Sequence, residues 1–195
     1  GLSQAVQGFS PLPYVAKELA SIHKTLGGQI LLDDAFLLDN VEKELKKKPY
    51  TIVHIASHGQ FESNTQENFI LTYDNKITMD TLEQLIGLGK FRDQPVELLV
   101  LSACQTATGD DRAALGLAGI AIKAGARSAI ATLWFINDRA ASDLVAEFYS
   151  QLKVKHLSKA QALQQAQVYL INNTGNTAYR HPYFWSPFLL IGNWL

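Results

Sequence analysis

The chain has 195 residues, of which 47% are hydrophobic, and its formal net charge at pH 7 is −1. This length and apolar content suffice for one domain with a full hydrophobic core. The balanced charge argues against nucleic acid or an anionic membrane as a partner, and no apolar run has the length of a membrane span. The single cysteine excludes an internal disulfide framework and predicts a reducing compartment, so we expect a cytoplasmic protein.

The first part of the chain predicts two helices followed by a buried strand. Residues 14–25 have helical character and stop at Gly27-Gly28, and a second helix is expected over residues 34–47, before Pro49. Residues 51–59, TIVHIASHG, form a mostly apolar, β-branched run. Such a run is typical of a buried parallel strand that ends at a polar loop.

The middle of the chain predicts a small hairpin, a helix and a second buried strand. Residues 69–73 and 76–78 flank the turn pair Asp74-Asn75, and Asp80 is expected to cap a helix that runs to about residue 88. Residues 98–104, LLVLSAC, repeat the apolar character of the first buried run and close on the only cysteine.

The last part of the chain continues the alternation of helices and strands. A loop over residues 106–112 precedes further expected elements: a small-residue helix at 113–124, a strand at 127–133, a helix at 138–152, a helix capped by Ser158 and a strand at 188–192. This alternation predicts an α/β fold with a mostly parallel sheet and helices on both faces.

Two chemically reactive residues stand at the ends of the two buried runs, His58 and Cys104. Ligands of open α/β sheets bind beyond the carboxyl ends of the strands, so neighbouring strands bring this imidazole and this thiol together. An adjacent imidazole activates a thiol for acyl transfer, which predicts a cysteine peptidase. The backbone amides of Gly59 and Cys104 are the expected oxyanion donors, because glycine lets a substrate approach the main chain closely.

Each of these residues also has a purely structural interpretation. Free cysteine is commonly buried as a small hydrophobe, and His58 can simply be a histidine with satisfied nitrogens at a strand end. His54 and His58 have the spacing of two zinc ligands on a helix. On a strand, however, four residues span about 13 Å, so we expect no metal site and interpret His54 as a core histidine.

Three segments resemble the CHAT domain: IVHIASHGQF (52–61), LLVLSACQTATGDDRAALGLAGIAIKAGARSAIATLW (98–134) and HPYFWSPFLLIGNW (181–194). The resemblance covers residues 11–195. It implies a caspase-like three-layer sandwich related to separase and the caspases, with His58 as base or acid, Cys104 as nucleophile and no cofactor. It also implies protein or peptide substrates, and a tetratricopeptide-repeat region in the parent chain.

The comparison with caspases also shows a difference. His58 precedes Cys104 by 46 residues, close to the separation of about 50 in caspases. The sequence SACQT around Cys104 lacks the caspase cysteine-arginine-glycine signature, so cleavage after aspartate is not implied.

The resemblance further implies a specificity residue. Separases carry an acidic residue shortly after a leucine-tryptophan pair, and Asp138 stands at the comparable place after Leu133-Trp134. It is therefore expected to receive a basic side chain before the scissile bond, although Asn137 and Asp138 are also ordinary helix-capping residues. Asp110 and Asp111 either touch substrate or solvate a turn, and the turn is the simpler interpretation.

The start of the chain suggests an incomplete sheet. In CHAT domains the segment similar to residues 1–13 usually follows a first core strand, so the resemblance implies a piece of a larger polypeptide that lacks this strand. The main alternative to a peptidase is a non-catalytic regulatory or interaction module that keeps the fold. An amidotransferase is disfavoured, because the chain lacks a glycine-cysteine-glycine elbow.

Overall fold

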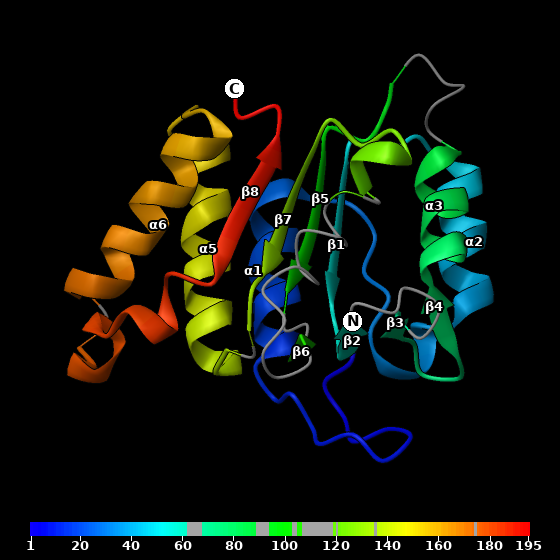
Figure 1. The fold of residues 1–195 in the computed structure, drawn as a ribbon, viewed down its shortest axis with the longest axis horizontal. Helices are drawn as coiled ribbons and strands as arrows, with labels where there is room; N and C mark the ends of the chain where they lie inside the picture. Colours follow the sequence, from blue (N-terminus) through cyan, green and yellow to red (C-terminus); the bar gives the residue numbers. More distant parts are fainter. Residues whose placement is uncertain are drawn as a thin grey trace.

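In the described part of the chain, four strands form a central, mostly parallel sheet (Figure 1). The computed structural model describes residues 1–61, 68–88, 94–102, 105–106, 119, 121–134, 136–173 and 175–195. The sheet order is β1(Ile52–Ala56), β5(Leu98–Ser102), β7(Ser128–Thr132) and β8(Phe188–Gly192). The first three strands are parallel and β8 is antiparallel to β7, which confirms the predicted α/β class and the pairing of the two buried runs.

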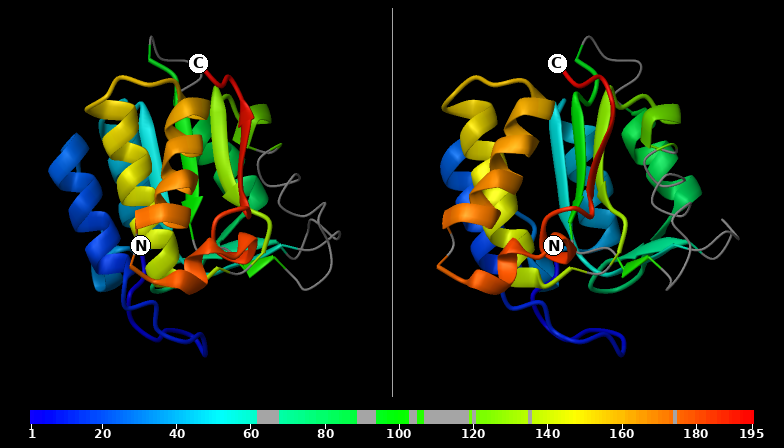
Figure 2. Two further views of the ribbon diagram at one scale, coloured as in Figure 1. Left: turned by 90° about the vertical axis from the view of Figure 1, so that its left-hand side faces the viewer. Right: turned by 60° about the vertical axis from the view of Figure 1, so that its left-hand side comes forward.

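Helices cover both faces of this sheet, as Figure 2 shows. One face packs against α1(Val15–Leu26) and α5(Asp138–Lys153), with α6(Lys159–Asn173) beside α5, and the other faces α2(Leu38–Lys47) and α3(Met79–Gly87). Side chains alternate between the faces along each strand. Leu99 and Leu101 therefore belong to the core beneath α2 and α3, whereas Leu98 and Val100 pack with α1 and α5. The arrangement is consistent with a caspase-like sandwich.

A second, smaller sheet lies at the carboxyl ends of β1 and β5 (Figure 1). Its order is β4(Lys76–Thr78), β3(Phe69–Leu71), β2(Gly59–Phe61) and β6(Gln105–Thr106). The antiparallel pair of β3 and β4 confirms the predicted hairpin. The run that was expected to be one strand over residues 51–59 thus bends after Ala56 and enters β2.

Two boundaries differ from the sequence-based expectations. The helix expected over residues 34–47 begins only at Leu38, because the chain forms the short helix η1(Asp33–Ala35) and then turns Phe36 into the core, where it is 4% exposed. The cap of α3 is Thr78, whose Oγ accepts from the Thr81 amide at 3.2 Å, so Asp80 lies inside the first turn.

The other helix expectations are confirmed where the structure describes them. Asn137 caps α5 through its Oδ1, which accepts from the Ala140 amide at 3.2 Å, and Ser158 Oγ accepts from the Gln161 amide at 3.3 Å at the start of α6. Of the predicted helix over 113–124, residues 119 and 121–123 are helical and most of the rest lies outside the described residues. None of the helices in the described ranges combines the length and apolar character of a membrane span.

Candidate functional site

The backbone around His58 is fixed between the two sheets. The Ser57 amide donates to the Ser102 carbonyl at 3.2 Å, and Ser57 Oγ donates to the Leu71 carbonyl at 2.6 Å. The Leu71 amide in turn donates to the His58 carbonyl at 2.8 Å. These bonds hold the chain where it leaves β1 and enters β2, and they bury His58, which is 6% exposed.

The hydrogen bond made by the His58 ring determines which nitrogen carries the proton. Nε2 lies 2.7 Å from the Ser10 carbonyl oxygen, and a carbonyl only accepts, so Nε2 is the donor. In the neutral imidazole the lone pair is then on Nδ1. Nδ1 is buried and has no hydrogen-bond partner within the described residues.

Aromatic contacts hold the face of the same ring. The Phe9 ring lies 5.0 Å from the imidazole, centroid to centroid, at an interplanar angle of 34°. Phe9 also contacts Phe69 of β3 edge-on, with centroids 6.3 Å apart. The imidazole is therefore held by a carbonyl at one nitrogen and by an apolar wall at its face. Both contacts come from the segment that precedes α1.

The neighbouring strand β5 ends beside the turn that carries His58. Ser102, its last residue, stands opposite Ala56 in the register of β1 and β5. Ser102 is fully buried, and its Oγ, like Nδ1 of His58, has no hydrogen-bond partner among the described residues. Two buried polar atoms without a described partner thus lie at the carboxyl ends of adjacent strands.

Of the remaining predicted site residues, some belong to the described part of the chain and others do not. Cys104 follows Ser102 by two residues, as His58 follows Ala56 by two, but Cys104, Asp110 and Asp111 lie outside the described residues. Gly59 is buried, and its main chain lies at the same edge of the sheet as His58, because it opens β2 and pairs with Ile70 of β3.

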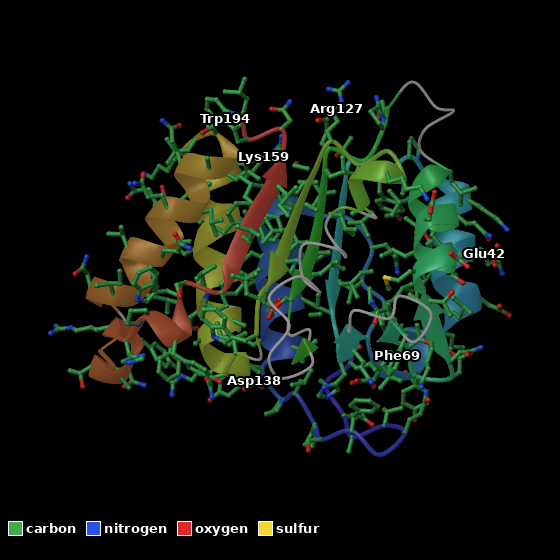
Figure 3. The ribbon with its side chains drawn as sticks, viewed as in Figure 1. Glu42, Phe69, Arg127, Asp138, Lys159 and Trp194 are labelled. Carbon is green, nitrogen blue, oxygen red and sulfur yellow. The ribbon has the colours of Figure 1, made fainter. Side chains whose placement is uncertain are left out.

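Asp138 lies at the end of α5 toward which β1, β5 and β7 point (Figure 3). Its Oδ2 accepts from the Tyr14 amide at 3.1 Å, at the start of α1. This bond joins two helices and gives Asp138 a structural contact. The other carboxylate oxygen makes no hydrogen bond within the described part of the chain.

His54 faces a different environment from His58. Its Nε2 lies 2.8 Å from Glu18 Oε1 of α1, and its Nδ1 lies 3.2 Å from the Tyr149 hydroxyl of α5. All three side chains are buried, which confirms His54 as a core histidine. No group of histidine, cysteine, aspartate and glutamate side chains in the described ranges is arranged to hold a metal ion.

Sequence reasoning missed the residues that hold the His58 ring. Phe9 contacts its face and Ser10 contributes a main-chain carbonyl, for which the side-chain sequence carries no signal. Glu18, the partner of His54, was also missed. The sequence did carry a signal for it, because a carboxylate stands on the apolar helix face formed by Val15, Leu19 and Ile22. A charged residue at such a position predicts a buried partner.

Comparison with known sequences covers nearly the whole chain. The CHAT domain family model matches residues 2–193, which include every described strand and both His58 and Cys104. No curated protein matches the chain.

Proposed function

The chain belongs to the CHAT family of caspase-like peptidase domains, and we propose that it is a cysteine endopeptidase acting on protein or peptide substrates. The observation that carries this proposal is the imidazole of His58. Its proton is held on Nε2 by the Ser10 carbonyl, while its buried Nδ1, at the carboxyl end of β1, has no hydrogen-bond partner in the described part of the chain. That is the arrangement that a general base needs.

In the proposed reaction Cys104 Sγ transfers its proton to His58 Nδ1 and attacks the carbonyl carbon of the scissile bond. The amides of Gly59 and Cys104 stabilise the oxyanion. The carbon–nitrogen bond then breaks as Nδ1 returns the proton to the leaving amine, which leaves a thioester on Cys104. Water, deprotonated by His58, hydrolyses that thioester and restores the thiol. The Ser10 carbonyl stabilises the imidazolium in both steps, because Nε2–H donates to it throughout.

The register of the sheet supports this pairing of residues. β1 and β5 are parallel neighbours, with Ala56 opposite Ser102, and the two proposed catalytic residues follow their strands by equal numbers of residues. Cys104 is the only cysteine of the chain, so a thiol mechanism has one candidate nucleophile.

The experiment is cleavage of a peptide library by the wild-type protein beside the Cys104→Ala and His58→Ala variants. We expect cleavage that both substitutions abolish, together with alkylation of Cys104 faster than that of a buried thiol. His23→Ala is the matched control, because this histidine is exposed on α1 and should leave cleavage intact. Absence of cleavage with an unreactive Cys104 would instead favour a non-catalytic regulatory module.

We further propose that Asp138 binds a basic side chain at the position before the scissile bond. One carboxylate oxygen holds the Tyr14 amide, and the other is available to a guanidinium or ammonium group. Asp138→Asn keeps an oxygen for Tyr14 but loses the charge. Because a hydrogen bond to a charged group contributes about 1.5–3 kcal/mol, the preference for arginine or lysine should fall about 10- to 100-fold in kcat/KM. Asp143→Asn, in the same helix, is the control, and an unchanged preference in Asp138→Asn would refute the assignment.

A further inference from the structure

Residues 3–12 form a loop that carries both contacts of the His58 ring, and we call this loop the strap. We propose that Asp33 is a positioning residue for His58, which holds the strap so that the Ser10 carbonyl stays on Nε2. The effect on the ring is independent of any reaction. The effect on catalysis rests on the peptidase function proposed above.

The Asp33 carboxylate binds the beginning of the strap through three hydrogen bonds. It accepts from the Ser3 amide at 2.6 Å, from the Ser3 hydroxyl at 2.7 Å and from the Gln4 amide at 3.2 Å. Asp33 is 8% exposed and has a φ of +50°, a backbone conformation that aspartate, asparagine and glycine tolerate better than other residues. An acceptor with two oxygens is therefore presented to the strap from a constrained position.

Ser3 connects the two ends of the strap, so the Asp33 carboxylate is linked through Ser3 to both ends. The Leu12 amide donates to the Ser3 carbonyl at 3.0 Å, which closes the loop. At its tip the Phe9 amide donates to the Val6 carbonyl at 2.9 Å, and Gln7 Nε2 donates to the Thr72 carbonyl at 3.2 Å. Ser10 lies between the tip and the base.

Apolar contacts and polar anchors together hold the strap in place, because Val6 and Phe9 pack against the core beneath α2 and α3. Among its residues only Leu12 is buried, Ser3, Val6 and Phe9 are partly exposed, and the rest are exposed. Its two polar anchors are the Asp33 carboxylate and the main chain at Thr72 and Tyr73, whose carbonyls accept from Gln7 Nε2. Of the two, Asp33 provides the larger number of hydrogen bonds and the only charged acceptor.

Asp33 is suited to this role because it stays ionised. Burial alone would raise its pKa, but the hydrogen bonds from the Ser3 side chain and from the Ser3 and Gln4 amides outweigh that effect, and the pKa is lowered. The carboxylate thus keeps its full accepting capacity for all three donors.

Loss of this anchor changes the chemical state of His58. Once the Ser10 carbonyl leaves Nε2, the neutral imidazole is free to place its proton on Nδ1 instead. A ring in that tautomer cannot accept a proton at Nδ1. Because a displacement of about 1 Å costs up to about 100-fold in rate, even a small shift of the strap matters for a reaction at this ring.

The first test is an NMR measurement of the histidine ring nitrogens, which needs no activity. Asp33→Gly removes all three hydrogen bonds and tolerates the positive φ, whereas Asp33→Asn keeps one accepting oxygen. Asp34→Asn, at an exposed neighbour in the same short helix, is the matched control. His58→Gln identifies the signals of His58 among those of the five histidines.

We expect wild-type His58 to be protonated at Nε2 and unprotonated at Nδ1. In Asp33→Gly the two tautomers should both be populated, Asp33→Asn should be intermediate, and Asp34→Asn should match the wild type. A purely structural role for Asp33 would alter thermal unfolding but leave the tautomer unchanged, and that result would overturn the proposal. If Asp33→Gly does not fold, Ser3→Ala removes the hydroxyl bond alone and is tested in the same way.

The second test is kinetic. Asp33→Gly is expected to lower kcat about 10- to 100-fold with KM unchanged, with partial recovery in Asp33→Asn. If the wild-type protein cleaves no peptide, the proposed function fails and the tautomer measurement alone decides this inference. If the wild type is active and Asp33→Gly has the kcat of Asp34→Asn, the positioning role fails while the peptidase assignment stands.

Discussion

Removal of the Glu18 carboxylate is expected to destabilise the domain strongly, because this carboxylate is the partner of a histidine inside the core. The side chains of His54 and Glu18 are only 5% and 2% exposed, and their closest atoms, Nε2 and Oε1, are 2.8 Å apart. Removing one member of such a pair leaves the other buried without its partner, which typically costs about 3–5 kcal/mol. For Glu18→Leu we expect a loss of about 3 kcal/mol in the free energy of unfolding.

The loss is measurable by two assays. For a domain of this size each kcal/mol corresponds to about 2–4 °C in Tm, so Glu18→Leu should lower Tm by about 6–12 °C. Urea unfolding, followed by circular dichroism and by tryptophan fluorescence, gives the free energy directly. The control is Glu42→Leu, which breaks the exposed pair with Lys46 in α2 and should change stability very little (Figure 3 labels Glu42).

A double substitution distinguishes pairing from packing. Replacing Glu18 and His54 together by leucine removes both polar groups, and buried pairs replaced in this way often recover stability. The double variant should therefore be more stable than Glu18→Leu alone. A loss in Glu18→Leu no larger than in Glu42→Leu, or fully additive losses in the double variant, would refute the interpretation of His54 and Glu18 as a coupled buried pair.

Three further expectations follow from particular contacts. Gly192→Ala should destabilise the fold more than Gly175→Ala, as measured by unfolding in urea. Both glycines have positive φ, for which an alanine costs about 1 kcal/mol, but only at Gly192 does the added Cβ also collide with a backbone atom, the Arg127 carbonyl oxygen. The pKa of Asp33 is lowered in the folded protein. Its carboxylate therefore stabilises the fold fully when the pH is above the pKa of the unfolded chain, and this contribution is lost as the pH falls through the folded-state pKa. The difference in unfolding free energy between wild type and Asp33→Asn should therefore shrink only below pH 3.8, and a difference that disappears already at neutral pH would contradict this. Burial, with the Glu18 charge, raises the pKa of Tyr149 well above its ordinary value, so in an alkaline absorbance titration its phenol should ionise only when the domain unfolds.

The central sheet was predictable because the amino-acid composition of each strand segment by itself indicates a buried strand. The runs ending near His58 and Cys104 are apolar along their whole length, as buried parallel strands are, and the helices between them have helical spacing. The same runs place His58 beyond the carboxyl end of β1, which is the edge where ligands of such sheets bind. The pairing of Ala56 with Ser102 confirms that the two runs are neighbours.

The boundaries that were wrong depend on tertiary contacts instead. The pattern of Phe36, Val41 and Leu45 fits a helix, yet Phe36 leaves the helix because the core accepts its ring outside α2. At α3 both Thr78 and Asp80 are good capping residues, and the hairpin that ends at Thr78 decides between them. Neither outcome follows from local sequence.

The two histidines of β1 and its following turn differ in how their rings are partnered. His54 lies inside the strand, opposite Val100, where α1 and α5 supply partners for both of its nitrogens. His58 lies two residues beyond the strand, and a main-chain carbonyl supplies the only hydrogen bond of its ring found within the described residues. Both ring nitrogens of His54 thus have side-chain partners, whereas Nδ1 of His58 has none among the described residues. Position relative to the end of the strand, rather than residue type, therefore accounts for the different partners of the two rings.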